Sequence, residues 1–294
     1  MTAIKTILVA LDLEAGSNAV LARAMQIASA HAARLLVLHV IEADSLAQTA
    51  ELSERSETEL REDLKRHAFT AIETKVFESG DVRRTEVWVE FGVPHEIVAR
   101  VAGDHYADLI VIGPGKGRTL KERVLGSTAD RIIRSATSSV LMVGRESAAP
   151  YEHILAAVDF SEQSATAVTE ALRLAPHAKM QLLHAVETPL AFAQAMLRAG
   201  TPQTEIQRYE TARADKAREE LAAPAGRISS EGNLGLRVVD GSAGPTLVRL
   251  SKAGGIDLIA IGPHGRGIVR QALLGSVTQR VLREAACDVL VARS

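Results

Sequence analysis

The second half of this 294-residue chain repeats the first half, and this internal repeat constrains the fold more than any other feature. The segment Gly92–Arg134 aligns without gaps to Gly241–Arg283, including the match of Asp-Leu-Ile-Val-Ile-Gly-Pro to Asp-Leu-Ile-Ala-Ile-Gly-Pro. Two further pairs of segments match: Ile7–Asp12 with Ile154–Asp159, and Leu35–Val40 with Met180–Ala185. The repeat predicts two domains of one fold, which we place at residues 1–147 (the first unit) and 148–294 (the second unit).

Each unit alternates short apolar segments with segments of helical periodicity. Continuous runs rich in Val, Ile and Leu predict parallel strands that are buried on both faces. In the first unit these runs are Ile7–Leu11, Leu35–Val40, Leu109–Ile112 and Val140–Val143, and the helical segments include Ala19–Ala33 and Pro94–Ala102. The alternation predicts an α/β fold of two tandem doubly wound, Rossmann-like domains, each a five-stranded parallel sheet flanked by helices.

The middle of each unit differs between the copies. Residues 44–75 and 189–222 are rich in charge, predict helices and align poorly with each other. Each is interpreted either as a solvated amphipathic helix or as a lid or partner-binding element. A short polar linker at residues 145–150 joins the units and keeps them close.

The composition argues against several classes of partner. The formal net charge is −2, from 34 basic and 36 acidic residues, so neither nucleic acid nor an anionic membrane is an expected partner. Aromatic residues make up 3 % of the chain, which provides few stacking surfaces for single-stranded nucleic acid. The apolar runs have strand length and Asp12 interrupts the first of them, so we expect no export signal and no membrane span. With a single cysteine, Cys287, these features favour a reducing cytoplasm.

A glycine-rich loop of the second unit carries the most specific chemical signal. Gly262-Pro-His-Gly265 is followed, after nine further residues, by Gly275-Ser276, and the loop lies between a predicted strand and a predicted helix. Glycine lets the backbone approach a phosphate closely, and the N-terminus of a helix attracts negative charge. The spacing fits neither the Gly-Lys-Ser/Thr phosphate loop nor the Gly-x-Gly-x-x-Gly dinucleotide loop. We therefore expect a different kind of phosphate site here.

The pattern Gly-x2-Gly-x9-Gly-Ser, together with the opening strands that end in Asp12 and Asp159, resembles the universal stress protein superfamily and in particular its ATP-binding branch. The resemblance covers nearly the whole chain and implies adenine nucleotide α-hydrolase-like domains related by a pseudo-two-fold axis. It also implies ATP as the ligand, with Mg²⁺ where the nucleotide carries it. In the second unit it assigns to the nucleotide Asp159, Ala185, Gly262, His264, Gly265, Gly275, Ser276 and Val277. The first two would face the nucleoside, Gly262 the ribose, and the others the phosphates.

The first unit departs from this pattern at one place. Its loop reads Gly113-Pro-Gly-Lys116-Gly, so Lys116 stands where the second unit has Gly265. A side chain there is unfavourable if the position needs a positive φ or a close approach to phosphate. Two outcomes stay open: Gly115 and Gly117 let the loop shift so that Lys116 contacts phosphate, or the first unit is a degenerate copy or binds another ligand. The matching residues of the first unit are Asp12, Val40, Gly113, Lys116, Gly126, Ser127 and Thr128.

Other polar residues have simpler interpretations. Asp12 and Asp159 are predicted to contact the ligand, with helix capping as the alternative. His39 and His184 lie within apolar strands and are predicted to be hydrogen-bonded core residues rather than bases. Cys287 lies in a terminal strand, and no residues stand at metal-ligand spacing, so we expect neither a catalytic nucleophile nor a metal site.

These features predict a nucleotide-binding module of the cytoplasmic stress response, which acts as a conformational or partner-binding switch and is not an enzyme. Two alternatives stay open: an enzyme of low activity that hydrolyses nucleotides, and a ligand-free scaffold that presents its divergent helices to a protein partner. The final strands, Ser139–Val143 and Cys287–Val291, are apolar edges that need cover. The resemblance implies that they pair across the pseudo-two-fold axis, so that the chain mimics a homodimer, and further homodimerisation stays open.

Overall fold

The computed structural model describes residues 3–14, 16–42, 46, 56–78, 84–115, 125–187, 194–196, 198–228, 234–265 and 273–293. Within these ranges, the strands of the first unit are β1 (Thr6–Leu11), β2 (Arg34–Ile41), β3 (Thr85–Phe91), β4 (Leu109–Ile112) and β5 (Ser139–Met142). Those of the second unit are β6 (His153–Ala157), β7 (Lys179–Val186), β8 (Leu234–Asp240), β9 (Leu258–Ile261) and β10 (Asp288–Val291).

The main helices alternate with these strands. Those of the first unit are α1 (Ser17–His31), α3 (Glu57–Glu78), α4 (Pro94–Asp104) and α5 (Ser127–Ser135). Those of the second unit are α6 (Glu162–Leu174), α8 (Gln203–Ile228), α9 (Ala243–Lys252) and α10 (Ser276–Glu284). No helix among the described residues is long and apolar enough to span a membrane.

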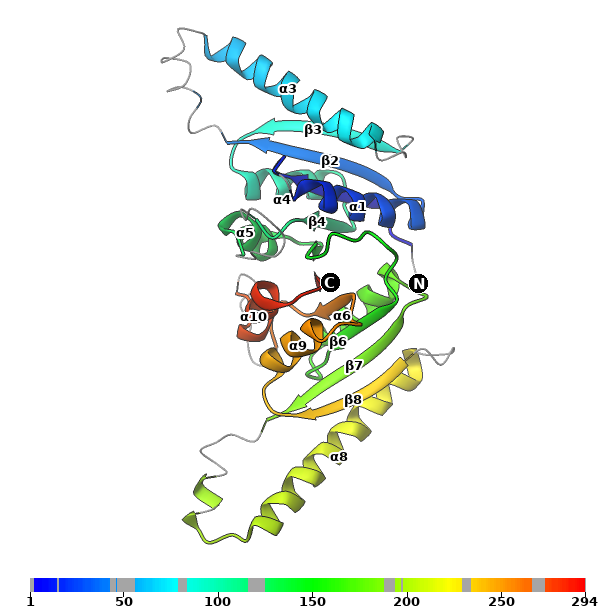
Figure 1. Ribbon diagram of the computed structural model, residues 1–294, viewed down its shortest axis with the longest axis vertical. Coiled ribbons are helices and arrows are strands. Elements are labelled where there is room, and N and C mark those ends of the chain that lie inside the picture. The colour runs from blue at the N-terminus through cyan, green and yellow to red at the C-terminus, as the bar shows by residue number, and fades with distance from the viewer. Residues whose placement is uncertain are drawn as a thin grey trace.

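All ten strands form one continuous sheet, in the order β3-β2-β1-β4-β5-β10-β9-β6-β7-β8 (Figure 1). Within each unit the strands are parallel and the order is that of a doubly wound fold, as expected. The chain order reverses between β1 and β4 and again between β6 and β9, which is where such sheets form their ligand sites.

The two units join through the antiparallel pairing of β5 with β10, which confirms that the final strands cover each other. Leu141 lies opposite Leu290 in this pairing, and the repeat makes these two residues equivalent. Val140 pairs with Val291, and Met142 pairs with Val289. Because Val140 is equivalent to Val289 and Met142 to Val291, exchanging the two units turns one pair into the other. A pseudo-two-fold axis therefore passes between Leu141 and Leu290.

Each face of the sheet carries a hydrophobic core that extends across both units. Strand side chains alternate between the faces, so that Ile7 and Val9 contribute to one core and Leu8 to the other. Residues of α1, α3, α6 and α8 cover the first core, and residues of α4, α5, α9 and α10 cover the second. Figure 1 shows α3 and α8 at the two far ends of the molecule, beside the outer strands.

The two predicted polar segments are helical in most of the part that the structure describes, including residues 46, 194–196 and 198, while residues 44–45, 47–55, 189–193 and 197 lie outside the described residues. The main helix of the segment 44–75 is α3, which begins at Glu57, and that of the segment 189–222 is α8, which begins at Gln203. Ser56 and Glu59 explain the start of α3, because the Ser56 hydroxyl accepts from the Glu59 N–H at 3.2 Å while the Glu59 carboxylate accepts from the Ser56 N–H at 3.2 Å. This reciprocal capping box is a sequence signal for a helix start at residue 57.

Two equivalent aspartates hold the start of the first strand of each unit. The Asp108 carboxylate accepts from the backbone N–H groups of Lys5 at 2.8 Å and Thr6 at 3.0 Å, and from Arg173 of α6 at 2.5 Å. Burial raises the pKa of Asp108, but these hydrogen bonds outweigh it and hold the pKa below its usual value. Burial also raises the pKa of Asp257, but hydrogen bonds from backbone N–H groups and from Arg145 outweigh it, so this pKa is lowered as well.

These lowered pKa values predict a stability that depends on pH. A carboxyl with a lower pKa in the folded state stabilises the fold above its ordinary pKa of about 4, and this stabilisation is lost as the pH falls through the lowered value. We expect Asp108→Asn to lower the free energy of unfolding by about 1.5 kcal/mol at pH 7. The difference from the wild-type chain should shrink as the pH falls below about 4, because the unfolded wild-type chain then binds a proton that folded Asp108 takes up only at its lower pKa. Urea unfolding from pH 7 to pH 3 measures this, and a difference that stays constant over that range would contradict it.

Candidate functional site

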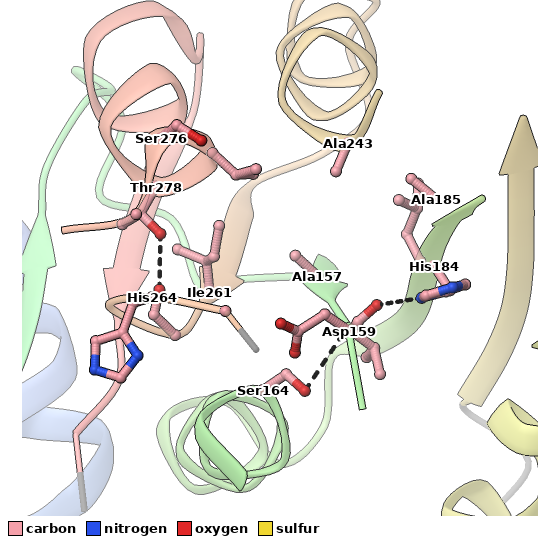
Figure 2. Close-up of a pocket in the computed structure, with 16 residues that line it drawn as sticks. Ala157, Asp159, Ser164, His184, Ala185, Ala243, Ile261, His264, Ser276 and Thr278 are labelled. Atoms are coloured by element: carbon pink, nitrogen blue, oxygen red, sulfur yellow. Dashed lines mark hydrogen bonds between the residues drawn. The ribbon is translucent and has the colours of Figure 1, made fainter. Parts of the chain in front are cut away.

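A pocket of about 290 Å³ lies in the second unit at the carboxyl ends of β6, β7 and β9. All eight residues that the sequence assigned to this unit's ligand line it. Figure 2 shows that the pocket lies between the start of α6 below and the starts of α9 and α10 above. The structure therefore brings the predicted residues together at the point where the strand order reverses.

Asp159 directs the turn that leads from β6 into α6. Its Oδ1 accepts a hydrogen bond from the Ser161 N–H at 3.0 Å and another from the Ser161 hydroxyl. The Ser161 hydroxyl in turn accepts from the Ser164 N–H at 3.2 Å and caps α6. Phe160, between them, has a left-handed φ of 64°, which is unusual for a bulky residue and occurs at functional turns.

The same turn occurs in the first unit, where Asp12 Oδ1 accepts from the Glu14 N–H at 3.0 Å and Leu13 has a φ of 61°. Both aspartates therefore organise the backbone after the first strand. Asp159 also lines the pocket, so in the second unit one side chain both organises the turn and forms part of the candidate site.

Gly265 lies directly against this carboxylate. A Cβ atom at Gly265 would lie 2.6 Å from Asp159 Oδ2, so any side chain there would force the carboxylate to move. Gly265 does not have a left-handed φ, so the backbone conformation does not require glycine at this position. Close approach, and not backbone conformation, is the reason for glycine here.

The other two glycines of the loop hold the strand and helix ends close together. A Cβ at Gly262 would lie 2.9 Å from Gln163 Cβ and 3.1 Å from the Gln163 carbonyl carbon, so β9 packs directly on the first turn of α6. A Cβ at Gly275 would lie 3.2 Å from His264 Cα. The Gly275 N–H donates to the Pro263 carbonyl at 2.8 Å and closes the loop at its base.

The N-terminus of α10 forms one end of the pocket. Gly275 is its N-cap residue and provides no side chain to cap the first turn, and Ser276 is exposed. The Thr278 hydroxyl donates to the Gly262 carbonyl at 2.8 Å, which ties the start of α10 to the end of β9 (Figure 2). An uncapped helix N-terminus attracts anions through its backbone N–H groups and its dipole.

Ala157, Ala185 and Ala243 form an apolar slot with small side chains on the side of the pocket away from Ser276 (Figure 2). Leu183 and Ile261 also line the pocket. At the positions of Ala185 and Ala243, the first unit has the larger Val40 and Pro94. The second unit therefore has more room at this end of its site.

His184 lines the pocket, and its ring also holds the neighbouring backbone through a hydrogen bond, as predicted. Its Nδ1 donates to the Val158 carbonyl at 2.7 Å, and its ring packs on Phe160 with 4.5 Å between the centroids. In the first unit His39 makes the same bond to the Leu11 carbonyl at 2.7 Å. The predicted role of His39 and His184 as hydrogen-bonded core residues is confirmed.

His264 lines the pocket, as the resemblance implied, through its backbone and not through its ring. Figure 2 shows its imidazole pointing away from the centre of the pocket. Its Nδ1 is buried and has no hydrogen-bond partner among the residues that the structure describes. The physical reason is the tight closure of the loop, which brings the His264 Cα against Gly275 and directs the side chain outward.

In the first unit the described start of the corresponding loop has a different backbone conformation. Gly115 stands at the position of His264 and has a φ of 101°, in the left-handed region. A Cβ at Gly115 would lie 2.8 Å from Gly126 Cα, so this position requires glycine. The bond that closes the loop is retained between the Gly126 N–H and the Pro114 carbonyl at 2.8 Å. Lys116 lies outside the described residues.

The remaining predicted residues of the first unit lie at positions equivalent to those of the second. Asp12 follows β1, Val40 lies near the end of β2, and Gly113 follows β4. Gly126, Ser127 and Thr128 form the N-cap and first turn of α5. One structural bond is absent, because Ala129 stands where Thr278 binds the Gly262 carbonyl.

Eight residues that line the pocket were not predicted. They are Ala157, Val158, Ser164, Leu183, His184, Ala243, Ile261 and Thr278. Four of them, Val158, His184, Ile261 and Thr278, are direct neighbours of predicted residues in the sequence, so their signal was their place beside those residues. Among the described residues, no group of three or more His, Cys, Asp or Glu side chains is placed to hold a metal ion.

Comparison with known proteins gives a consistent result over the whole chain. The model of the universal stress protein family matches residues 3–144 and again 150–293. A universal stress protein of Mycolicibacterium smegmatis is 29 % identical over 293 residues, which cover 98 % of this chain and 96 % of that protein. Universal stress protein A homolog 1 of Coxiella burnetii is 33 % identical over 139 residues, which cover 47 % of this chain and 95 % of its own.

A solved structure has the same fold over the whole chain. The protein PA1789 of Pseudomonas aeruginosa, described as functionally unknown, superimposes with a TM-score of 0.65 at 22 % identity and covers 99 % of this chain and 93 % of its own. The two matches to the family model and the full-length superposition both place two domains in tandem.

Proposed function

We propose that this chain, which belongs to the universal stress protein family, binds an adenine nucleotide in its second unit and acts as a conformational or partner-binding switch in the cytoplasmic stress response. One observation carries the proposal: a single pocket has an apolar slot at one end and an uncapped helix N-terminus at the other. A nucleotide has the same division, with a flat base at one end and an anionic phosphate chain at the other.

The dimensions of the pocket support a nucleotide in which the base is enclosed and the phosphates reach the mouth. Its volume of about 290 Å³ is near the lower end of the range for small-molecule sites, roughly 300 to 1,000 Å³. The base and ribose would occupy the slot beside Ala185 and Gly262, and the phosphates would lie along Gly265, Gly275 and Ser276. Mg²⁺ bound to the phosphates would add positive charge at the mouth.

The polar groups of the pocket favour binding over catalysis. Asp159 accepts from Ser161, the Ser164 hydroxyl donates to the Ser161 carbonyl at 2.9 Å, and Thr278 donates to Gly262. Because these groups hold the backbone of the site, we propose that the bound nucleotide acts through its presence and is not turned over.

Calorimetric titration tests the binding proposal. ATP with Mg²⁺ should bind the full chain at one site, and adenosine should bind the same site more weakly because it lacks the contact with α10. If neither ligand produces saturable heat or raises the melting temperature, the nucleotide proposal is wrong and the ligand-free scaffold is favoured. If purified protein releases phosphate from ATP over many turnovers, and Asp159→Ala abolishes this, the proposal of binding without catalysis is wrong.

The apolar end of the pocket gives a separate prediction. Ala243 is the first residue of α9, a position that accepts proline, and the first unit has Pro94 there. Ala243→Pro combined with Ala185→Val gives the second unit the wider side chains of the first and should lower the affinity for ATP and for adenosine equally, by about tenfold. If the variant loses affinity for ATP but not for adenosine, the base does not bind in the apolar slot.

A further inference from the structure

A buried ion pair connects the two units. Arg23 of α1 is 1 % exposed and Asp288, the first residue of β10, is 0 % exposed, with 3.1 Å between Nε and Oδ2. The Arg23 guanidinium lies 4.2 Å from the ring centroid of Tyr151, whose hydroxyl donates to Asp288 Oδ2 at 2.7 Å. Burial raises the pKa of Asp288, and burial together with the charge of Asp288 raises that of Tyr151, so Tyr151 stays a donor. The pair links one unit to the other inside the protein.

The linker between the units completes this site with backbone groups. Arg23 donates to two carbonyl oxygens of the linker, and Asp288 Oδ1 accepts from two of its N–H groups. The distances are 2.6 Å to the carbonyls of both Ser147 and Ala149, and 2.8 Å and 3.0 Å to the N–H groups of Gly144 and Arg145. Backbone groups thus compensate both charges in part, and the Arg23 Nε–H, which has no hydrogen-bond partner among the described residues, keeps its ion-pair distance of 3.1 Å to Asp288 Oδ2.

The pseudo-two-fold axis creates a second copy of this contact, and its chemistry is different. In the repeat Glu170 stands at the position of Arg23, and Ser139 at the position of Asp288. The Ser139 hydroxyl donates to Glu170 Oε2 at 3.5 Å. The Arg293 N–H donates to the Ser139 hydroxyl at 3.1 Å, just as its counterpart Gly144 donates to Asp288. The same contact is thus made once by opposite charges and once by a carboxylate and a hydroxyl.

This asymmetry determines which units fit together. If the second unit paired with a copy of itself through β10, Glu170 would face Asp288 at both contacts. If the first unit paired with a copy of itself through β5, Arg23 would face Ser139 at both contacts. A buried charge that loses its partner strongly destabilises a structure, and two facing carboxylates do so further. Glu170 keeps Arg173 of its own helix, at 3.5 Å, in every pairing, whereas Arg23 and Asp288 compensate each other only when the first unit pairs with the second.

We infer that Arg23, Asp288, Glu170 and Ser139 form a charge code that makes the contact between the units selective. The face of the second unit formed by β10 and α6 accepts a unit with a buried arginine at the position of Arg23, and it rejects a second copy of itself. The code favours pairing of the two units within the chain over homodimers of either unit through the same strands.

Substitutions in the full chain test the code. Arg23→Met removes the charge, and Arg23→Glu gives the first unit the carboxylate that a second copy of the second unit would present. In urea unfolding at pH 7 we expect Arg23→Met to raise the unfolding equilibrium constant about a hundredfold, and Arg23→Glu about tenfold more. Adding Asp288→Ser to Arg23→Glu reproduces the Glu170–Ser139 contact and should reverse at least about tenfold of the loss.

Glu170→Gln is the matched control, because Glu170 is 20 % exposed and faces a hydroxyl, and it should change the unfolding constant less than about fivefold. The inference is wrong if Arg23→Glu is as stable as Arg23→Met, or if Asp288→Ser brings no recovery. If Arg23→Glu does not fold, the double variant decides: a folded double variant supports the charge code, and an unfolded one overturns it.

Discussion

Replacing Gly265 with lysine should lower the affinity of the chain for ATP at least about a hundredfold, equivalent to about 2.7 kcal/mol. A Cβ at this position would lie 2.6 Å from Asp159 Oδ2, so the carboxylate has to move. Asp159 also holds the Ser161 N–H, and its displacement disturbs the start of α6. Gly265→Ala brings only the Cβ and should lower the affinity about tenfold. Calorimetric titration of ATP measures both effects, and adenosine should be less affected than ATP.

The reciprocal substitution in the first unit provides the control. Lys116→Gly should leave the affinity of the second unit unchanged and the stoichiometry at one ATP per chain. We expect no second site, because Gly115 has a left-handed φ that its counterpart His264 does not have and because Val40 and Pro94 are larger than the alanines at the apolar end of the second unit. Unchanged binding by Gly265→Lys would show that the phosphates do not lie along this loop.

Gly262→Ala should destabilise the protein by about 1–3 kcal/mol, since overpacking of a close contact costs energy of this order. The added Cβ would meet the Cβ and the backbone carbonyl carbon of Gln163, at 2.9 Å and 3.1 Å, in the first turn of α6. Backbone atoms of a helix cannot turn aside as a side chain can, so α6 and β9 have to separate. The affinity for ATP should fall in the same variant, because these two elements form the floor of the pocket.

The equivalent glycine of the first unit offers a matched comparison. A Cβ at Gly113 would meet only the Val20 Cγ2 atom, at 3.3 Å, and a side-chain methyl group can shift by that amount. Gly113→Ala should therefore change the free energy of unfolding by less than about 1 kcal/mol. Urea unfolding of both variants measures the difference, and equal effects in the two units would contradict the importance of the Gln163 backbone contact.

The architecture could be predicted from the sequence because its signals are local and occur twice. Runs such as Leu109–Ile112 are apolar at every position, which only a strand buried on both faces requires. The start of α3 at Glu57 was not predicted although Ser56 and Glu59 carry a capping signal, because α3 buries few of its residues and its apolar periodicity is weak.

The site could be predicted only in part, for physical reasons that differ between residues. The glycines and Ser276 were found because a phosphate loop restricts residue type and spacing. The direction of the His264 ring depends on how tightly the loop closes, which no residue type encodes. Arg23 and Asp288 gave no signal at all, because a single arginine within a helix is usually solvated and its partner lies at the other end of the chain.

The covalent link between the halves also affects how this protein can change over generations. In a dimer of identical chains every substitution appears twice, so a charge introduced at one contact is introduced at its mirror position as well. Here β5 and β10 belong to one polypeptide, and each substitution appears once. Arginine could thus arise at position 23 while glutamate remained at position 170, and glycine could be lost from one loop while the other kept it. The fusion therefore allows the two halves to carry different residues at equivalent positions.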